Sequence, residues 1–241
     1  MLKKFSKKGM VGMVKKIVLA IVLFIACCTS VFAADSSPSW EWISSDSVHT
    51  LYLDVNNVEY DRGERVAHVV FKASFMKDKD GRYTLLYYTF DFNRKAMEQT
   101  QYVRVDTEGN EGEVKKPIVS DYVYIAPDSW SEKAANRVAD LYGIPHLYKR
   151  TSNGWKLVKS TPQQSIYIDK DSLDYNPDQN YCYVWAKFQG LPGHEYTTRY
   201  YCDFTHNTVS IRNFEGQKNP QSAYGNTDSA IIFYNAKRLC W

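Results

Sequence analysis

The chain contains an internal duplication, which restricts its fold more than any other feature of the sequence. Residues 40–72 align without a gap on residues 155–187, at a shift of 115 positions, and seven of the 33 aligned positions are identical. These seven are Trp40, Ser45, Tyr52, Asp54, Tyr60, Val69 and Lys72, which meet Trp155, Ser160, Tyr167, Asp169, Tyr175, Val184 and Lys187. A second block matches at a shift of 112, where Tyr88, Asp91 and Phe92 meet Tyr200, Asp203 and Phe204. The sequence therefore predicts two copies of one structural unit.

The first 33 residues have the pattern of a secretory signal peptide. A basic segment with six Lys precedes an apolar run of 12 residues, Ile17–Cys28, which is too short for a comfortable membrane span. Val31 and Ala33 stand where a signal peptidase reads small residues, so cleavage between Ala33 and Ala34 is expected. The alternative is lipoprotein processing at Cys27, which would attach the chain to a membrane. Either route predicts an exported protein of the periplasm or the outer cell surface.

Removal of this leader reverses the sign of the net charge. The whole chain has a formal charge of +3, but without the six leader Lys it has 24 basic residues against 27 acidic ones, a charge of −3. No basic stripe with interleaved aromatic residues follows the leader. The composition therefore speaks against nucleic acid as a partner.

Each copy is expected to be a meander of antiparallel strands that ends in one helix, an α+β fold. Residues rich in β-branched and aromatic side chains predict strands, with turn-forming sequences between them. The expected strands include residues 50–54, 66–71 and 83–92 in copy one, and residues 165–169, 180–188 and 195–204 in copy two. Trp40 and Trp155 are expected to begin the first strand of each copy as core aromatics.

The helix of copy one is predicted from its capping residues. Ser129 and Glu132 form a capping box, and Gly143 provides a C-terminal stop. One helical face carries Ala134, Ala135, Val138, Ala139 and Leu141, and it must be buried on the sheet of the same copy. The second helix is expected at about residues 228–239. The predicted organisation is a signal peptide (1–33), a tether (34–39), repeat one (40–142), a linker (143–154) and repeat two (155–241).

The cysteines suggest one disulfide bond in copy two. Export would place the chain where disulfides persist. The positions of copy one that match Cys202 and Cys240 are Phe90 and Ala139, so both sulfurs are missing from the same copy. This predicts a Cys202–Cys240 bond, worth roughly 4 kcal/mol in the chain-entropy model. Cys182 is expected to be a small buried residue out of reach of both, and the alternative is three unpaired thiols.

The sequence carries no catalytic, metal-binding or cofactor-binding signature. No two His lie at metal-ligand spacing on one helix, and Cys-x-x-Cys, His-Glu-x-x-His, Gly-x-Ser-x-Gly and glycine-rich phosphate loops are absent. Asp54 and Asp169 occur in both copies, but each ends a short strand, where Asp commonly accepts hydrogen bonds from the next backbone amides. We therefore expect a protein that is not an enzyme and has no catalytic residue, metal or cofactor.

Tyrosine is abundant, with 19 residues in 241. Most are expected on half-buried sheet faces, where tyrosine makes cross-strand pairs. Tyrosine is also favoured at binding surfaces, because it is large, stiff and amphipathic. The candidates for an exposed binding face are Tyr196, Tyr200, Tyr201 and Tyr224.

The assembled pattern resembles the surface-adhesin protein E family of Gram-negative bacteria. Copy two matches it through Trp155, Tyr167-Ile168-Asp169, Trp185-Ala186-Lys187, Cys202 and Cys240, and copy one through Trp40, Tyr52-Leu53-Asp54, Lys72, Pro127, Ser129 and Glu132. Copy one departs from the pattern by lacking both Cys, and copy two lacks the Pro-x-Ser entry to its helix. The resemblance implies a small antiparallel sheet with one helix, cell-surface display, homodimers in some members, and binding to host matrix or plasma proteins.

The function expected from these observations is an exported, adhesin-like protein-interaction module of the cell envelope. The alternative is a periplasmic carrier or sensor that holds a small ligand between the two repeats, which would need an apolar cleft near Ile144–Leu147. A third class is an enzyme or inhibitor whose site is built from scattered residues.

Overall fold

The computed structural model describes residues 37–76, 80–118, 121–151, 154–190, 195–213 and 216–241. The expected cleavage site at Ala33 and Ala34, and the alternative processing site at Cys27, lie outside these residues. Pro38–Trp241 forms one unit. In the part of the chain that is described, no helix is long and apolar enough to cross a membrane.

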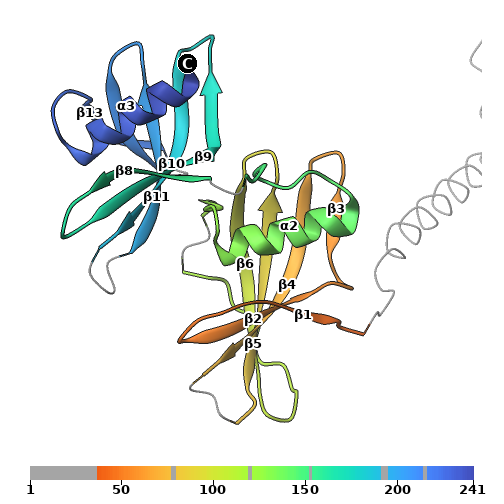
Figure 1. Cartoon of the computed structure of the whole chain (residues 1–241). Coiled ribbons are helices and arrows are strands. Elements are labelled where there is room, and N and C mark those ends of the chain that lie inside the picture. Colours follow the sequence, from red (N-terminus) through yellow and green to blue (C-terminus); the bar gives the residue numbers. More distant parts are fainter. Residues whose placement is uncertain (1–36, 77–79, 119–120, 152–153, 191–194, 214–215) are drawn as a thin grey trace, which may run out of the picture. The chain divides into compact units, whose positions relative to one another are not determined.

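The first sheet contains seven strands, all paired antiparallel. Its order is β1-β2-β4-β5-β6-β7, and β3 pairs with β4 beside β2. The strands are β1 (Trp40–Ser45), β2 (His49–Asp54), β3 (Glu59–Asp61), β4 (Val66–Phe75), β5 (Tyr83–Asp91), β6 (Ala96–Val105) and β7 (Val123–Tyr124). Figure 1 shows this sheet with one helix across it.

The second sheet contains six strands, also all antiparallel. Its order, β8-β9-β10-β11-β12-β13, follows the chain, so it is a simple meander. The strands are β8 (Trp155–Ser160), β9 (Ser165–Asn176), β10 (Tyr181–Gln189), β11 (Tyr196–Asp203), β12 (Thr208–Asn213) and β13 (Gly216–Ser222). Two antiparallel sheets with two helices make an α+β fold, as the sequence predicts.

Aligned residues occupy matching places in the two sheets. Val69 lies opposite Tyr88 in the first sheet, and the aligned pair, Val184 and Tyr200, lie opposite each other in the second. The first two strands of each sheet have a bulge at the same aligned positions, 42–44 and 157–159. Left-handed turn residues also correspond, at Arg65 and Asn180 and at Lys95 and Asn207. The registers, bulges and turns of these segments therefore correspond between the two sheets.

The helix of the first half, α2 (Trp130–Tyr142), begins and ends where its capping residues predict. The Ser129 hydroxyl accepts a hydrogen bond from the Glu132 amide at 3.1 Å, and Gly143 closes the helix at φ 64°. The buried face carries Ser131, Glu132, Ala134, Ala135, Val138 and Ala139. Leu141, which we placed on this face, lies at its edge and is 39% exposed. The prediction was wrong for Leu141 because the buried stripe is centred nearer Ser131 and Ala135.

The second helix, α3 (Asp228–Cys240), packs on the second sheet. The Thr227 hydroxyl caps it by accepting from the Ala230 amide at 3.2 Å. Lys237 and Arg238 lie in its last turn, where positive charge favours the helix dipole. Each helix covers a separate apolar core, with Phe71, Phe90 and Ile125 among the buried residues near α2, and Ile166, Phe188 and Phe233 among those near α3.

Arg150 connects the first turn of α2 with the second sheet. Its guanidinium donates to Glu132 at 2.7 and 3.1 Å and to Asp169 of β9 at 2.8 Å. Glu132 is 4% exposed and Asp169 is fully buried. Nearby, the Trp155 indole donates to Asp128, and Trp185 of β10 belongs to the apolar core near α2. The two sheets are therefore joined by a partly buried ion cluster and by apolar packing, not by the linker alone.

The pKa values of this cluster follow from burial and from the neighbouring charges. Burial raises the pKa of Asp169 above its ordinary value, and Arg150 opposes that effect. Burial by itself would lower the pKa of Arg150, but Glu132, Asp169 and Asp128 together raise it. Because the pKa of Asp169 is higher in the folded chain than in the unfolded chain, this carboxyl favours folding at a pH below its pKa in the unfolded chain. That contribution to stability is lost as the pH rises through the pKa of the folded chain.

We expect Arg150→Met to lower the free energy of unfolding by about 3 kcal/mol at pH 7, because it leaves two buried carboxylates without a cation. Without Arg150 the pKa of Asp169 should rise further, so the deficit should shrink as the pH is lowered from 7 to 5. Urea unfolding followed by circular dichroism measures the free energy of unfolding at each pH. The matched control is Arg137→Met, which removes a more exposed ion pair to Glu41, with side chains 33% and 41% exposed, and should cost less than about 1 kcal/mol. Equal losses in the two variants would contradict the role given to Arg150.

Candidate anion site between the two sheets

A cavity of about 450 Å³ lies where the two sheets meet. The first sheet contributes the turn between β5 and β6 together with β7, and the second contributes four neighbouring strands. The lining residues are Asn93, Arg94, Lys95, Tyr124, Asp174, Tyr183, Arg199 and Arg212. A volume of this size is typical of small-molecule sites.

Strand alternation places the residues of the second sheet in this cavity. Along β10, Cys182 and Val184 point into the core under α3, so Tyr183 points to the opposite face. Along β11, Tyr200 and Cys202 face the same core, and Arg199 therefore shares the outer face with Tyr183. The Arg199 guanidinium lies between two rings, 4.2 Å from the centroid of Tyr124 and 4.4 Å from that of Tyr183. These cation–π contacts hold the guanidinium against both sheets.

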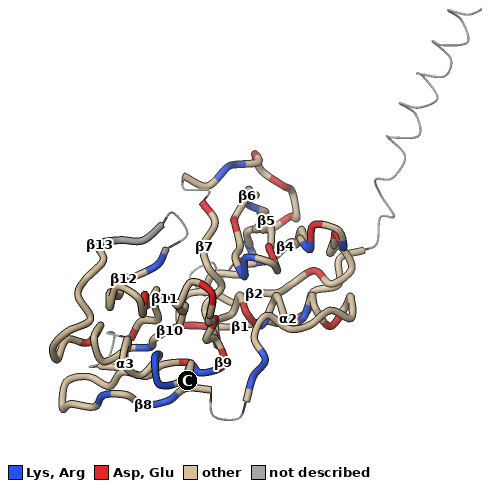
Figure 2. Tube along the Cα trace, turned by 90° about the horizontal axis from the view of Figure 1, so that it is seen from above, with Lys and Arg blue, Asp and Glu red and all other residues tan. Residues whose placement is uncertain are grey.

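The cavity is strongly basic. Four cationic side chains line it, against the single carboxylate of Asp174. Elsewhere basic and acidic residues are interspersed along the trace (Figure 2). In the described part of the chain, the buried Nε of Arg212 has no hydrogen-bond partner. A buried N–H without an acceptor is costly, and an anion in the cavity could supply one.

The pKa of Lys95 reflects this environment. Burial lowers it most, the carboxylate of Asp174 raises it, and the positive charge of Arg199 lowers it again. Lys95 reaches the cavity from a left-handed turn position, φ 52°, between β5 and β6. The site therefore combines desolvated positive charge with aromatic walls, an environment that favours a carboxylate or phosphate group.

A smaller cavity of about 260 Å³ lies at the linker, at the place where we expected an apolar cleft. Pro145, His146 and Leu147 line it, but so do Arg65, Phe92, Asn93 and Lys95. The expectation of an apolar cleft was wrong, because the turns of the first sheet bring polar and basic side chains to the linker.

The four tyrosines expected to form a binding face do not lie together. Tyr200 is only 5% exposed and belongs to the core under α3. Tyr201, the next residue of β11, points to the opposite face and contacts the rings of Tyr181 and Tyr183. Tyr196 and Tyr224 are the exposed members, at 52% and 66%. Neighbouring residues of one strand cannot share a face, so the four do not form one binding face, and Tyr196 and Tyr224 remain only as separate exposed candidates.

The predicted Cys202–Cys240 disulfide is not present. All three described cysteines are free thiols. Cys182 lies directly opposite Cys202 across β10 and β11, and Cys240 packs against the same core. Cys182 is buried, as we predicted, but it is not out of reach, and its neighbours change its chemistry. A hydrogen bond with Cys202 and burial raise the pKa of Cys182, and a hydrogen bond with Cys182 together with burial raises that of Cys240.

We expect the full chain, denatured without a reductant, to be alkylated at each of Cys182, Cys202 and Cys240. In the native chain at pH 7, Cys182 and Cys240 should react slowly, because raised pKa values keep both thiols protonated, and the rates should rise with pH. Peptide mapping by mass spectrometry after iodoacetamide treatment measures this. Recovery of two peptides linked through Cys202 and Cys240 would show that the disulfide bond exists and would contradict this expectation.

The aligned aspartates Asp54 and Asp169 accept hydrogen bonds from backbone amides, as we predicted, but only Asp54 ends its strand, whereas Asp169 lies inside β9 because that strand continues to Asn176. Asp54 accepts from the amides of Ser39 and Asn56 at 3.0 and 3.2 Å, and Asp169 accepts from the amide of Asp171 at 3.2 Å. Sequence reasoning did not find the additional role of Asp169 as the partner of Arg150. Among the described residues, no group of three or more His, Cys, Asp or Glu is placed to hold a metal ion.

Sequence reasoning also missed the basic cavity. Lys95, Arg199 and Arg212 lie in three separate segments, and no motif joins them. The one local signal is Lys95, a basic residue at a left-handed turn position. The aligned turn position in the other half is Asn207.

Comparison with known proteins gives little further guidance. No protein-family model matches the chain, and no curated protein matches it. One solved structure, that of Haemophilus influenzae protein E, is similar at 16% sequence identity, with a TM-score of 0.30, over 45% of this chain and 93% of that one. A likeness at this level carries no argument about function.

Proposed function

We propose that this protein is an exported binding protein that holds a small anion between its two sheets. The observation that carries the proposal is the cavity lined by four basic side chains and one carboxylate, with the Arg212 Nε unpaired among the described residues. This is the carrier or sensor function that the sequence offered as an alternative, with a basic cavity in place of the expected apolar cleft.

The electrostatics of the cavity explain why an anion would bind there. Burial lowers the pKa of Lys95 most, Asp174 raises it, and repulsion from the positive charge of Arg199 lowers it further. A carboxylate or phosphate would offset that repulsion and accept hydrogen bonds in a partly dry environment. Since residues of both sheets line the cavity, a bound anion would also stabilise the junction between them. The ligand class is therefore a phosphate or a compound with one or more carboxylates.

In this proposal, the site lies between two copies of one structural unit. We infer that the two halves are copies of one unit, on the basis of their matching registers, bulges and turns. The signal-peptide pattern supports export, which would expose the cavity to solutes of the periplasm or the cell exterior. The protein has no catalytic step in this view.

We expect the full chain to bind sodium phosphate or citrate saturably in isothermal titration at pH 7 and constant ionic strength. Arg212→Gln should weaken that binding roughly tenfold or more, because it removes a charge-assisted hydrogen-bond donor. The matched control is Arg238→Gln, an exposed residue in the last turn of α3. The proposal is wrong if neither anion binds saturably, or if the two variants bind alike.

The affinity should also depend on pH. The pKa of Lys95 is lowered by burial, so this side chain loses its charge at a lower pH than an ordinary lysine. An anion favours the charged form, and binding should therefore be weaker at pH 9 than at pH 7. Titrations with the parent and with Lys95→Gln test this, since the variant should lose most of the pH dependence. A parent affinity that does not change between these pH values would count against a role for Lys95.

An adhesin-like protein-interaction module is the second candidate. The observation that favours it is the exposure of Tyr196 and Tyr224, large amphipathic side chains that are frequent at binding surfaces. Host matrix and plasma proteins, and a second copy of the chain, are the partners to examine. In solid-phase binding, Tyr196→Ala with Tyr224→Ala should reduce a saturable signal, whereas Tyr234→Ala on α3 should not. No saturable signal from any of these proteins would argue against this candidate.

A further inference from the structure

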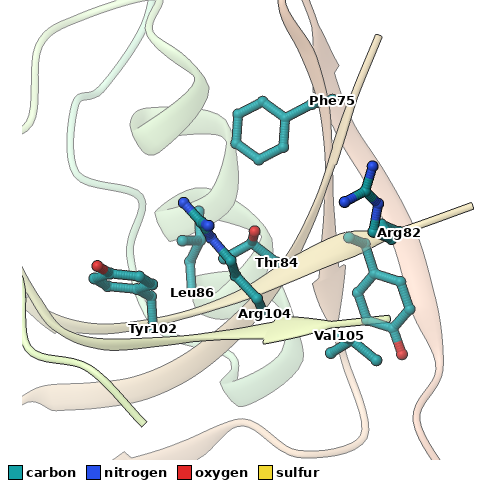
Figure 3. A pocket seen from close by; sticks show the side chains of 8 residues that line it. Phe75, Arg82, Thr84, Leu86, Tyr102, Arg104 and Val105 are labelled. Carbon is teal, nitrogen blue, oxygen red and sulfur yellow. The ribbon is translucent and has the colours of Figure 1, made fainter. Parts of the chain in front are cut away.

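A third cavity, of about 530 Å³, lies on the first sheet near the start of β5 and the end of β6. Its residues come from the end of β4, the start of β5 and the end of β6, on segments distinct from those that line the anion site. They are Phe75, Arg82, Tyr83, Thr84, Leu86, Tyr102, Arg104 and Val105. Figure 3 shows Thr84, Leu86 and Arg104 on the side of the two strands that faces Phe75, with Tyr102 beside them.

Strand pairing fixes the floor of this cavity. Thr84 lies opposite Arg104, and Leu86 lies opposite Tyr102, so these four side chains alternate across two paired strands on one face. Backbone hydrogen bonds between Tyr102 and Lys115 hold the outer edge of β6, at 2.8 and 2.9 Å. The floor is therefore built on a rigid element rather than on a loop, which favours a preformed site.

The second sheet shows what fills the matching place there. The residues aligned with Ala73 and Thr84 are Phe188 and Tyr196, and both pairs lie opposite each other across their strands. The rings of Phe188 and Tyr196 stack with centroids 4.5 Å apart and planes inclined by 10°. The first sheet has a methyl group and a short hydroxyl side chain at these positions. Thr84 lines the cavity whereas Ala73 is fully buried, so the cavity lies at the place where the other half of the chain has the ring of Tyr196.

The chemistry of the lining indicates which kind of molecule could take the place of those rings. Phe75, Leu86 and Tyr102 offer apolar and aromatic surface. Two guanidiniums, those of Arg82 and Arg104, lie at the rim, and Arg82 pairs with the carboxylate of Asp80 at 2.7 Å. No hydrogen bond or ion pair of the Arg104 side chain to another described residue is found. The cavity therefore combines apolar and aromatic surface with the cation of Arg104.

We propose that this cavity binds a small aromatic carboxylate. The ring would occupy the space that Tyr196 fills in the second sheet, against Tyr102 and Phe75, and the carboxylate would pair with Arg104. The Thr84 hydroxyl lies opposite Arg104 and can donate a further hydrogen bond. This site is separate from the proposed anion site, and either one can exist without the other.

The test uses 3-phenylpropionate as the probe, with propionate and 3-phenylpropan-1-ol as partial probes. The full chain should bind 3-phenylpropionate saturably in a titration followed by ligand-detected NMR, and should bind each partial probe at least roughly tenfold more weakly, because each lacks either the ring or the charge. Arg104→Gln should reduce the affinity for the probe by a similar factor, since Arg104 is exposed and its removal should leave the fold intact.

A second variant tests the comparison between the two sheets. Thr84→Tyr introduces the residue of the second sheet and should fill the cavity, so binding of 3-phenylpropionate should be abolished. Thr84→Val keeps the size of the side chain but removes the hydroxyl, so it should weaken binding far less than Thr84→Tyr does, and Arg212→Gln in the anion site should leave the affinity unchanged. Circular dichroism establishes that each variant is folded, and if Thr84→Tyr does not fold, Arg104→Gln alone decides the outcome.

Three results would overturn the proposal. The first is no saturable binding of 3-phenylpropionate by the full chain. The second is equal binding of the acid and the alcohol, which would make the site an apolar cleft without anion recognition. The third is an affinity that Arg104→Gln leaves unchanged, or that Arg212→Gln lowers as much, which would place the probe in the other cavity.

Discussion

The junction of the two sheets depends on one guanidinium group. Arg150 is the cation that faces the buried carboxylates of Glu132 and Asp169, one in the first turn of α2 and one on β9. Glu132 also accepts from the amide of Asp128 at 2.6 Å, and Asp169 from that of Asp171. Each carboxylate is therefore held by a hydrogen bond from a nearby backbone amide, in addition to its bonds with Arg150. Directional bonds of this kind specify one arrangement of the two elements, whereas apolar contact alone tolerates several.

That arrangement brings the basic residues together. Tyr124 lies on β7, the short last strand of the first sheet. The guanidinium of Arg199 reaches the Tyr124 ring from the outer face of the second sheet. Neither sheet alone has the cavity, because its lining comes from both. The ion cluster and the cavity thus have opposite electrostatics within one interface. Negative charge is buried and neutralised at Arg150, and positive charge is gathered and left in excess around Arg199.

Local patterns predicted the elements well, but they did not predict the contacts between distant segments. The capping residues Ser129, Glu132 and Gly143 located α2 to the residue, since capping is a local interaction. The disulfide failed because it was inferred from residues missing in the other copy, not from register. In the structure, Cys182 and Cys202 are direct cross-strand partners, a relation that depends on the length of the turn between their strands. The basic cavity requires Lys95, Arg199 and Arg212, which lie in three separate segments, to come together. A single sequence does not reveal contacts of this kind.

The left-handed turn at Lys95 has a consequence for how this chain can change over time. A lysine at φ 52° costs roughly 1 kcal/mol of backbone strain relative to a residue that tolerates this conformation, such as the Asn207 found at the matching turn. Lys95 is also partly desolvated beside Arg199. Exchange for asparagine would relieve the backbone strain and the charge repulsion together, and would at the same time remove one cation from the cavity. A drift toward greater stability at this position is therefore also a drift away from anion binding, so retention of lysine there in related chains would mark selection for the cavity rather than for the fold.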